Sequence, residues 1–232
     1  NGRAQGAVTK DGREYTAKDG VIGAIHPHHL GRMVAGLDPL VVKDAEATEM
    51  SPIACITVHA ALNGPIQFKA GPQVRAVMIE LLPNDYDTLR KSFDELRYQG
   101  FSSYPLVGLG SLTMHDPSRV PPGKATMHAW DYVPYERADG RSWDDTKREY
   151  AERMIRHMGR FIDGLPENII SYHCDSPVDM ERTSPSFLRG DLHGVAPNSY
   201  QLGAHRPTPD LGQMTVPGVE RLYLVRPFPH PG

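Results

Sequence analysis

The sequence predicts an α+β fold, in which an antiparallel β-sheet carries helices on one face. Three observations support this class. The apolar patterns between Ile53 and Cys174 follow the order β-β-α-β-β-α-β. Short turns join several of these strands, and short connections pair strands antiparallel. The two helical stretches in that order are amphipathic, so both can pack against the sheet.

The first elements along the chain are a hairpin and a short strand. Lys10-Asp11-Gly12 lies between two extended runs, and Asp-Gly in that position is typical of a tight hairpin turn. Residues 21–25 form a short apolar run that fits a buried strand. Residues 27–36 have room for a short helix.

The central part of the chain supplies the sheet. Its apolar runs are rich in β-branched residues and are bounded by turn signals such as Asn63-Gly64-Pro65 and Pro121-Pro122-Gly123. The predicted strands are residues 53–62, 74–82, 107–114, 125–133 and 169–173.

Two helices separate these strands. Asp85 can begin a helix that runs to about residue 98 and ends at Gly100. Ser142 can begin a longer helix that ends before Gly164. From residue 175 to residue 218 proline and glycine recur and the periodicity fades, so a long loop region is expected there.

Composition narrows the function classes. The net charge of -3 gives no basic surface, so we expect no nucleic-acid partner. No apolar run reaches the roughly 18 residues that a membrane span needs, although peripheral contact with a membrane stays open. Cys55 and Cys174 are too few for a disulfide framework. A reducing, cytoplasmic location is therefore expected.

Three histidines follow the early strand, in the order His26-Pro27-His28-His29. Zinc takes three or four nitrogen, sulfur or oxygen ligands, so a metal-dependent hydrolase that uses His26, His28 and His29 is one alternative. Because Pro27 extends the backbone, the rings are expected to diverge. The preferred interpretation is a histidine-rich loop without metal.

Among the internal segments, the best candidate for a catalytic site is Gly190-Asp191-Leu192-His193-Gly194. Asp191 and His193 could act as an acid–base pair, and they are the candidate catalytic residues. The alternative is structural, with Asp191 closing a tight turn between two glycines.

Two further patterns have structural alternatives. Gly108-x-Gly110 lacks the third glycine and the following helix of a dinucleotide loop, so no such site is expected there. Cys174 ends an apolar strand and is expected to pack rather than react. A group of aromatic residues could form a wall for an apolar ligand or fill the core: Trp130, Tyr132, Tyr135 and Trp143.

The last fifteen residues carry a family resemblance. Gly218–Gly232 reads G-V-E-R-L-Y-L-V-R-P-F-P-H-P-G, a strand that leads into a His-Pro-Gly turn. It resembles the closing motif of the phytoene desaturase-like FAD-dependent oxidoreductases, which include relatives of carotenoid desaturases and isomerases. Arg226 stands where that family usually has a small residue.

Two more segments are similar to the same family. Residues 183–194 read T-S-P-S-F-L-R-G-D-L-H-G, similar to its Gly-Asp-x-His-Gly segment, and residues 6–24 resemble its hairpin and returning strand. The resemblance implies the C-terminal portion of such an enzyme, with hydride transfer between a flavin and an apolar, isoprenoid or lipid-like substrate. It also implies that His230, Pro231 and Gly232 lie near the flavin.

The resemblance also suggests a domain plan. Residues 1–50 and 216–232 would be remnants of an FAD-binding α/β domain, residues 51–175 the substrate-binding domain, and residues 176–215 a long loop region. Because no G-x-G-x-x-G motif is present, we expect a fragment whose FAD-binding segment precedes Asn1, so that FAD is absent from this chain and the chain is inactive alone. A non-catalytic module that binds an apolar ligand is the first alternative. Without the flavin domain, the terminal turn should be exposed.

Overall fold

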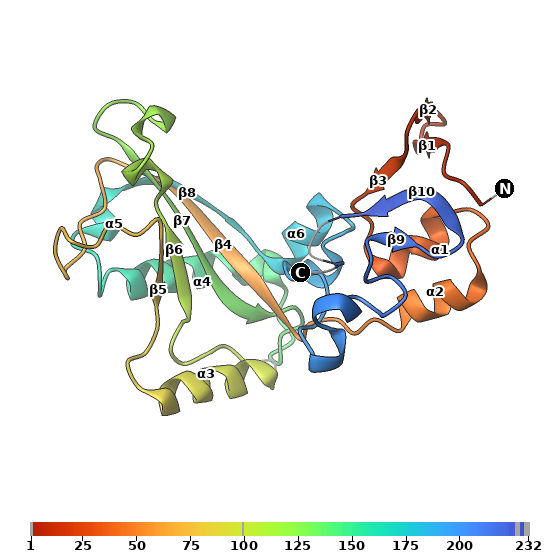
Figure 1. Cartoon of the computed structure of the whole chain (residues 1–232). Coiled ribbons are helices and arrows are strands. Elements are labelled where there is room, and N and C mark those ends of the chain that lie inside the picture. Colours follow the sequence, from red (N-terminus) through yellow and green to blue (C-terminus); the bar gives the residue numbers. More distant parts are fainter. Residues whose placement is uncertain (1, 99, 226–227, 230–232) are drawn as a thin grey trace. The chain divides into compact units, whose positions relative to one another are not determined.

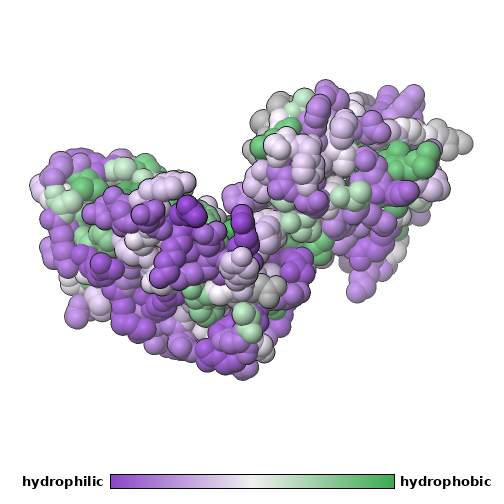
Figure 2. Space-filling view, turned by 90° about the horizontal axis from the view of Figure 1, so that it is seen from below, coloured by the Kyte–Doolittle hydropathy of each residue, from purple (hydrophilic) through white to green (hydrophobic). Residues whose placement is uncertain are grey.

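The computed structural model describes residues 2–98, 100–225 and 228–229 (Figure 1). The chain forms two compact units, both drawn in the space-filling view of Figure 2. Unit 1 combines Asn1–Ser51 with Thr183–Gly232, and unit 2 is Pro52–Arg182. The first unit is therefore built from both ends of the chain, and the second from its centre.

Unit 2 is built on a five-stranded sheet. Its strands are β4 (Ile53–Leu62), β5 (Met78–Leu81), β6 (Val107–Gly110), β7 (Ala125–Pro134) and β8 (Ile169–Asp175). They are ordered β5-β6-β7-β4-β8, and every neighbouring pair is antiparallel. The two long central strands, β4 and β7, pair from Ile53 opposite Pro134 to Leu62 opposite Ala125. The predicted α+β class with an antiparallel sheet is confirmed.

One face of this sheet forms the core of unit 2. Alternate residues of β4 and β7 point to it, and the long helix α4 (Trp143–Met158) packs against them. The buried stripe of α4 follows the helical repeat that its sequence predicts. Fully or almost fully buried members of this core include Ile56, Val58, Leu62, Met127, Ala129, Tyr150, Met154 and Met158.

The caps of both predicted helices are confirmed. The Asp85 carboxylate accepts the backbone N–H of Thr88 at 2.8 Å and begins α3 (Tyr86–Arg97). The Ser142 hydroxyl accepts the backbone N–H of Asp144 at 3.1 Å and begins α4. A short helix, α5 (Leu165–Asn168), then leads into β8.

Two predicted strands are shorter than expected. The strand predicted at residues 107–114 stops at Gly110, and a 3-10 turn at Leu112–Met114 follows it. Among the described residues β5 lies at the edge of the sheet and pairs with β6 alone, so its ladder is limited to four residue pairs, from Met78 opposite Gly110 to Leu81 opposite Val107. The strand predicted at residues 74–82 is therefore confined to Met78–Leu81.

Unit 1 contains two small sheets. Strands β1 (Gly6–Val8) and β2 (Glu14–Thr16) form the predicted hairpin. Strands β3 (Val21–Gly23), β10 (Val219–Leu224) and β9 (Thr215–Val216) form the second sheet in that order. Strand β3 pairs in parallel with β10, and Val21 lies opposite Leu222. The predicted meeting of the two ends of the chain is thereby confirmed.

The helices of unit 1 are short. A 3-10 turn (Pro27–His29) runs into α1 (Leu30–Met33), and α2 (Pro39–Glu46) follows. Helix α2 is not among the predicted elements, although Asp38 accepts the N–H of Leu40 as a cap and Pro39 occupies the first turn. The stretch expected to be loop holds α6 (Pro177–Thr183) and 3-10 turns at Leu188–Gly190, Ser199–Gln201 and Gly203–His205.

The helices throughout the described residues are too short or too polar to cross a membrane. The longest of them, α4, has 16 residues.

Candidate functional site

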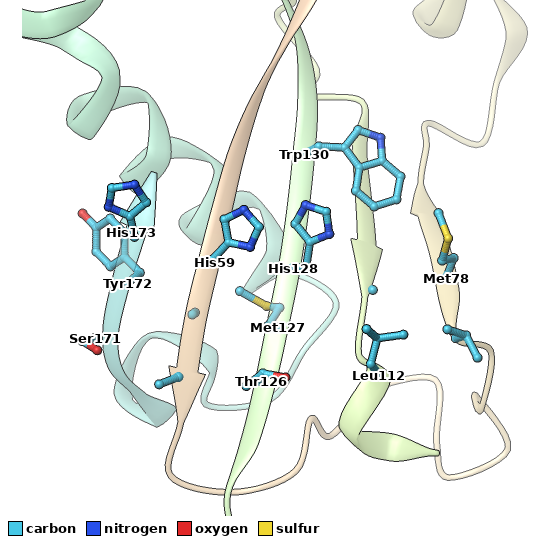
Figure 3. A pocket seen from close by; sticks show the side chains of 14 residues that line it. His59, Met78, Leu112, Thr126, Met127, His128, Trp130, Ser171, Tyr172 and His173 are labelled. Carbon is cyan, nitrogen blue, oxygen red and sulfur yellow. The ribbon is translucent and has the colours of Figure 1, made fainter. Parts of the chain in front are cut away.

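The face of the unit 2 sheet that points away from α4 is hollowed (Figure 3). Alternation along each strand sends a second set of side chains to this open face, including Thr57 and His59 on β4 and Thr126 and His128 on β7. The hollow has a volume of about 810 Å³. Pockets of a few hundred to about a thousand Å³ are typical of small-molecule sites.

The part of the hollow over β5 and β6 is apolar. Met78, Leu112 and Trp130 line it (Figure 3). Trp130 lies against Gly108 of β6, where a Cβ atom would come within 2.1 Å of the indole ring. Gly108 thus leaves room for the indole, which explains one glycine of the Gly108-x-Gly110 pattern without a nucleotide.

The other part of the hollow carries three histidines in one row. His59 on β4 lies opposite His128 on β7 and opposite His173 on β8. The rings of His59 and His128 stack, with centroids 4.5 Å apart and an interplanar angle of 4°. The Nε2 atom of His173 lies 2.9 Å from a carboxylate oxygen of Asp175. Burial, followed by the neighbouring His59, lowers the pKa of His128.

These three histidines are not among the site residues predicted from the sequence. Each occupies an outward position of a different predicted strand, in the polar alternations Thr57–His59, Thr126–His128 and Ser171–His173. The alternation indicates that each histidine points away from the core. Whether the three side chains lie side by side depends on the register of the strands, which the sequence does not give. Of the aromatic candidates, Trp130 lines the hollow, whereas Trp143 is buried in the core.

Cys174 lies on the buried side of β8, at 8% exposure. Burial raises the pKa of its thiol, which favours the unreactive protonated form. Its position fits the packing role expected from the sequence.

The predicted catalytic residues lie in unit 1. The Asp191 carboxylate is buried and accepts the backbone N–H of His193 at 2.8 Å and that of Ser51 at 3.4 Å. Burial raises its pKa. The His193 side chain is exposed, and the His193 carbonyl accepts a hydrogen bond from the buried Arg206. These contacts organise a turn, and the acid–base role of Asp191 and His193 stays a prediction.

The three histidines His26, His28 and His29 bind backbone carbonyls. Their Nε2 atoms lie 2.7 to 2.9 Å from the carbonyl oxygens of Gly194, Thr48 and Pro185 respectively. In His26 the Nδ1 atom accepts the N–H of His28, so Nε2 carries the proton, and burial lowers the pKa of this ring to about 4.

A metal needs an imidazole lone pair, whereas these Nε2 atoms face carbonyl oxygens that accept hydrogen bonds. Within the ranges that the structure describes, no group of three or more histidine, cysteine or acidic side chains is placed to hold a metal ion.

The terminal turn is only partly described. The predicted flavin-contact residues His230, Pro231 and Gly232, together with Arg226, lie outside the described residues. Phe228 is 2% exposed, and its ring lies 5.0 Å from the ring of His26. Pro229 is also buried. The expectation of an exposed turn is therefore wrong at these two positions, because the phenyl ring buries its apolar surface against His26.

Comparison with known proteins shows which solved structures have a similar fold. No family model matches this sequence, and no curated protein matches it. A solved oxidoreductase from Methanosarcina mazei has a similar structure, with a TM-score of 0.50 and 16% identity over 99% of this chain. Reduced UDP-galactopyranose mutase matches with a TM-score of 0.46 and 14% identity over 87% of the chain. This chain spans 42% and 40% of those two proteins. The chain therefore shares its fold with a segment of an oxidoreductase.

Proposed function

We propose that this chain is the substrate-binding portion of an FAD-dependent oxidoreductase, a dehydrogenase or desaturase related to the phytoene desaturases. Its substrate would be apolar, isoprenoid or lipid-like, and would lie in the hollow on the open sheet face. The observation that carries this proposal is the position of that mostly apolar hollow on the sheet of a fold found in an oxidoreductase.

The described residues do not form a dinucleotide loop. Gly108 and Gly110 lie inside an antiparallel strand that is followed by a 3-10 turn, and pyrophosphate binding needs a strand that turns into a helix N-terminus. In this proposal a segment that precedes Asn1 holds the FAD, and His230, Pro231 and Gly232 approach it. This chain then binds and orients the substrate, and Asp191 and His193 remain the candidate acid–base pair.

The cysteines suit a reducing compartment. Cys55 and Cys174 are the two cysteines of the sequence, and both are buried. A cytoplasmic location is proposed on that basis.

The proposal is tested on a protein extended upstream in its own reading frame. The extended protein should bind stoichiometric flavin and turn yellow, whereas the 232-residue chain should stay colourless. Trp130→Ala should slow flavin reduction by an apolar substrate about tenfold or more, because an aromatic contact is worth roughly 1.5–3 kcal/mol.

The matched control is Tyr86→Ala, which removes an aromatic residue that is 74% exposed on α3 and does not line the hollow. It should leave flavin reduction unchanged. An extended protein that purifies without flavin and cannot be loaded with it would refute the proposal.

A non-catalytic module for apolar ligands is the second candidate, since the hollow lies wholly within unit 2. A colourless extended protein that still binds apolar ligands would favour this candidate.

A further inference from the structure

We propose that the hollow binds an amphiphile with a carboxylate head group, which lies across His59 and His128 while its apolar chain lies against Trp130, Met78 and Leu112. This inference rests on the proposed role of the hollow as the substrate site. It narrows the substrate class from any apolar molecule to a carboxylic acid with an apolar chain.

The two ends of the hollow differ in chemistry. Over β5 and β6 the lining consists of a thioether, an indole, a leucine and the bare backbone of Gly110. Over β7, β4 and β8 the polar groups of the lining are imidazoles and the hydroxyls of Ser171, Thr126 and Tyr172, beside the apolar side chains of Met127 and two alanines. A ligand that fills both ends needs an apolar chain and one polar terminus.

The stacked imidazoles favour an acidic terminus over a neutral one. The ring nitrogens of His59 and His128 receive no hydrogen bond from the residues that the structure describes. Each neutral imidazole offers one ring N–H as a donor, and the pair can also take up a proton. A carboxylate stabilises the resulting imidazolium by charge-assisted hydrogen bonds. An alcohol can accept a hydrogen bond but gains nothing from that proton.

The other ionisable groups on this face limit where the carboxylate can lie. Asp175 on β8 lies beside His173 and would repel an anion there. Glu80 and Tyr132 share this face by alternation along β5 and β7, and burial raises the pKa of each. The stacked pair lies on β4 and β7, which stand between Glu80 on β5 and Asp175 on β8 in the strand order.

Binding should therefore be coupled to protonation. In the free protein, burial and the neighbouring His59 disfavour a charge on His128. A bound carboxylate reverses that balance, so one proton enters with the ligand. Uptake of one proton makes the Kd fall by up to about tenfold for each pH unit of acidification.

The experiment is calorimetric titration of the 232-residue chain with decanoate and with decanol, between pH 8 and pH 6.5. Buffers of different ionisation enthalpy report the protons taken up. Decanoate should bind more tightly than decanol, with uptake of about one proton, and only its Kd should fall on acidification. His59→Gln and His128→Gln should abolish that difference, whereas His205→Gln, on an exposed residue of unit 1, should retain it.

The outcomes separate this inference from the proposed function. Equal binding of acid and alcohol, without proton uptake, overturns the head-group assignment and leaves the apolar site standing. Binding of neither probe overturns both. Decanol should bind to both glutamine variants as it does to the parent chain, which shows that the apolar part of the hollow is intact. Retention of the acid preference in both variants, or an equal loss of acid and alcohol binding, overturns the inference.

Discussion

Asp131 gives the sharpest test of how unit 2 is stabilised. It occupies the core face of β7 and is fully buried. One carboxylate oxygen accepts the backbone N–H of Leu106 at 2.9 Å, and the other accepts the Tyr150 hydroxyl at 2.7 Å. Burial raises its pKa to about 6, despite these hydrogen bonds. At neutral pH the core therefore holds a charge that opposes folding.

The size of the effect follows from the two pKa values. The folded value of about 6 and the ordinary value of 3.8 differ by about two, and each pKa unit is worth 1.36 kcal/mol, so the cost is about 3 kcal/mol. The folded state holds the proton more tightly. Its stabilising contribution is therefore complete below pH 3.8 and is lost as the pH rises through 6.

Asp131→Asn replaces the carboxyl group with a neutral group of the same shape, which can donate to the Tyr150 oxygen and accept from Leu106. Relative to the parent, the variant should gain stability as the pH rises from 4 to 7, by up to about 3 kcal/mol. Urea unfolding monitored by tryptophan fluorescence measures this in unit 2, because both tryptophans, Trp130 and Trp143, lie there. A stability difference that is equal at pH 4 and pH 7 would refute the buried charge.

Three further predictions concern single contacts. Gly108→Ala should displace Trp130, shift its fluorescence and destabilise unit 2 by about 1–3 kcal/mol, whereas Gly110→Ala, whose Cβ would meet nothing closer than 3.6 Å, should do neither. Tyr150→Phe should cost about 1–3 kcal/mol in urea unfolding at pH 7, because it leaves an Asp131 oxygen without its donor. The low pKa of His26 means that its stabilising contribution is complete above pH 6.5 and is lost as the pH falls towards 4, so His26→Gln should flatten the acid-induced rise in amide exchange of β10.

The sequence predicts the elements of unit 2 well because each has a local signal. Asp85 and Ser142 are good caps, and α4 keeps one apolar stripe over four turns. The ends of strands are less predictable, because a strand ends where its hydrogen bonds to the neighbouring strand end. Residues 111–114 have the composition of a strand, but β6 ends at Gly110 and the chain enters a 3-10 turn.

The unit 1 helix α2 shows the opposite failure. Its start carries a clear signal, Asp38 followed by Pro39, yet this helix is not among the predicted elements. Leu40, Val41 and Val42 stand next to one another rather than at helical spacing, and among the residues of this helix only Ala45 is fully buried. A helix of 8 residues with so small a buried face gives little periodicity to detect.

The candidate site could not be predicted from local sequence patterns. His59, His128 and His173 are far apart in sequence, and each by itself resembles an ordinary outward side chain of a strand. A shift of one residue in the pairing of β4 with β7 would turn His128 into the core and bring Met127 to the open face. The register is held instead by the burial of Val58 against Ala129 and of Ala60 against Met127. The apolar core thus aligns the imidazole row on the opposite face, although no core residue belongs to the row.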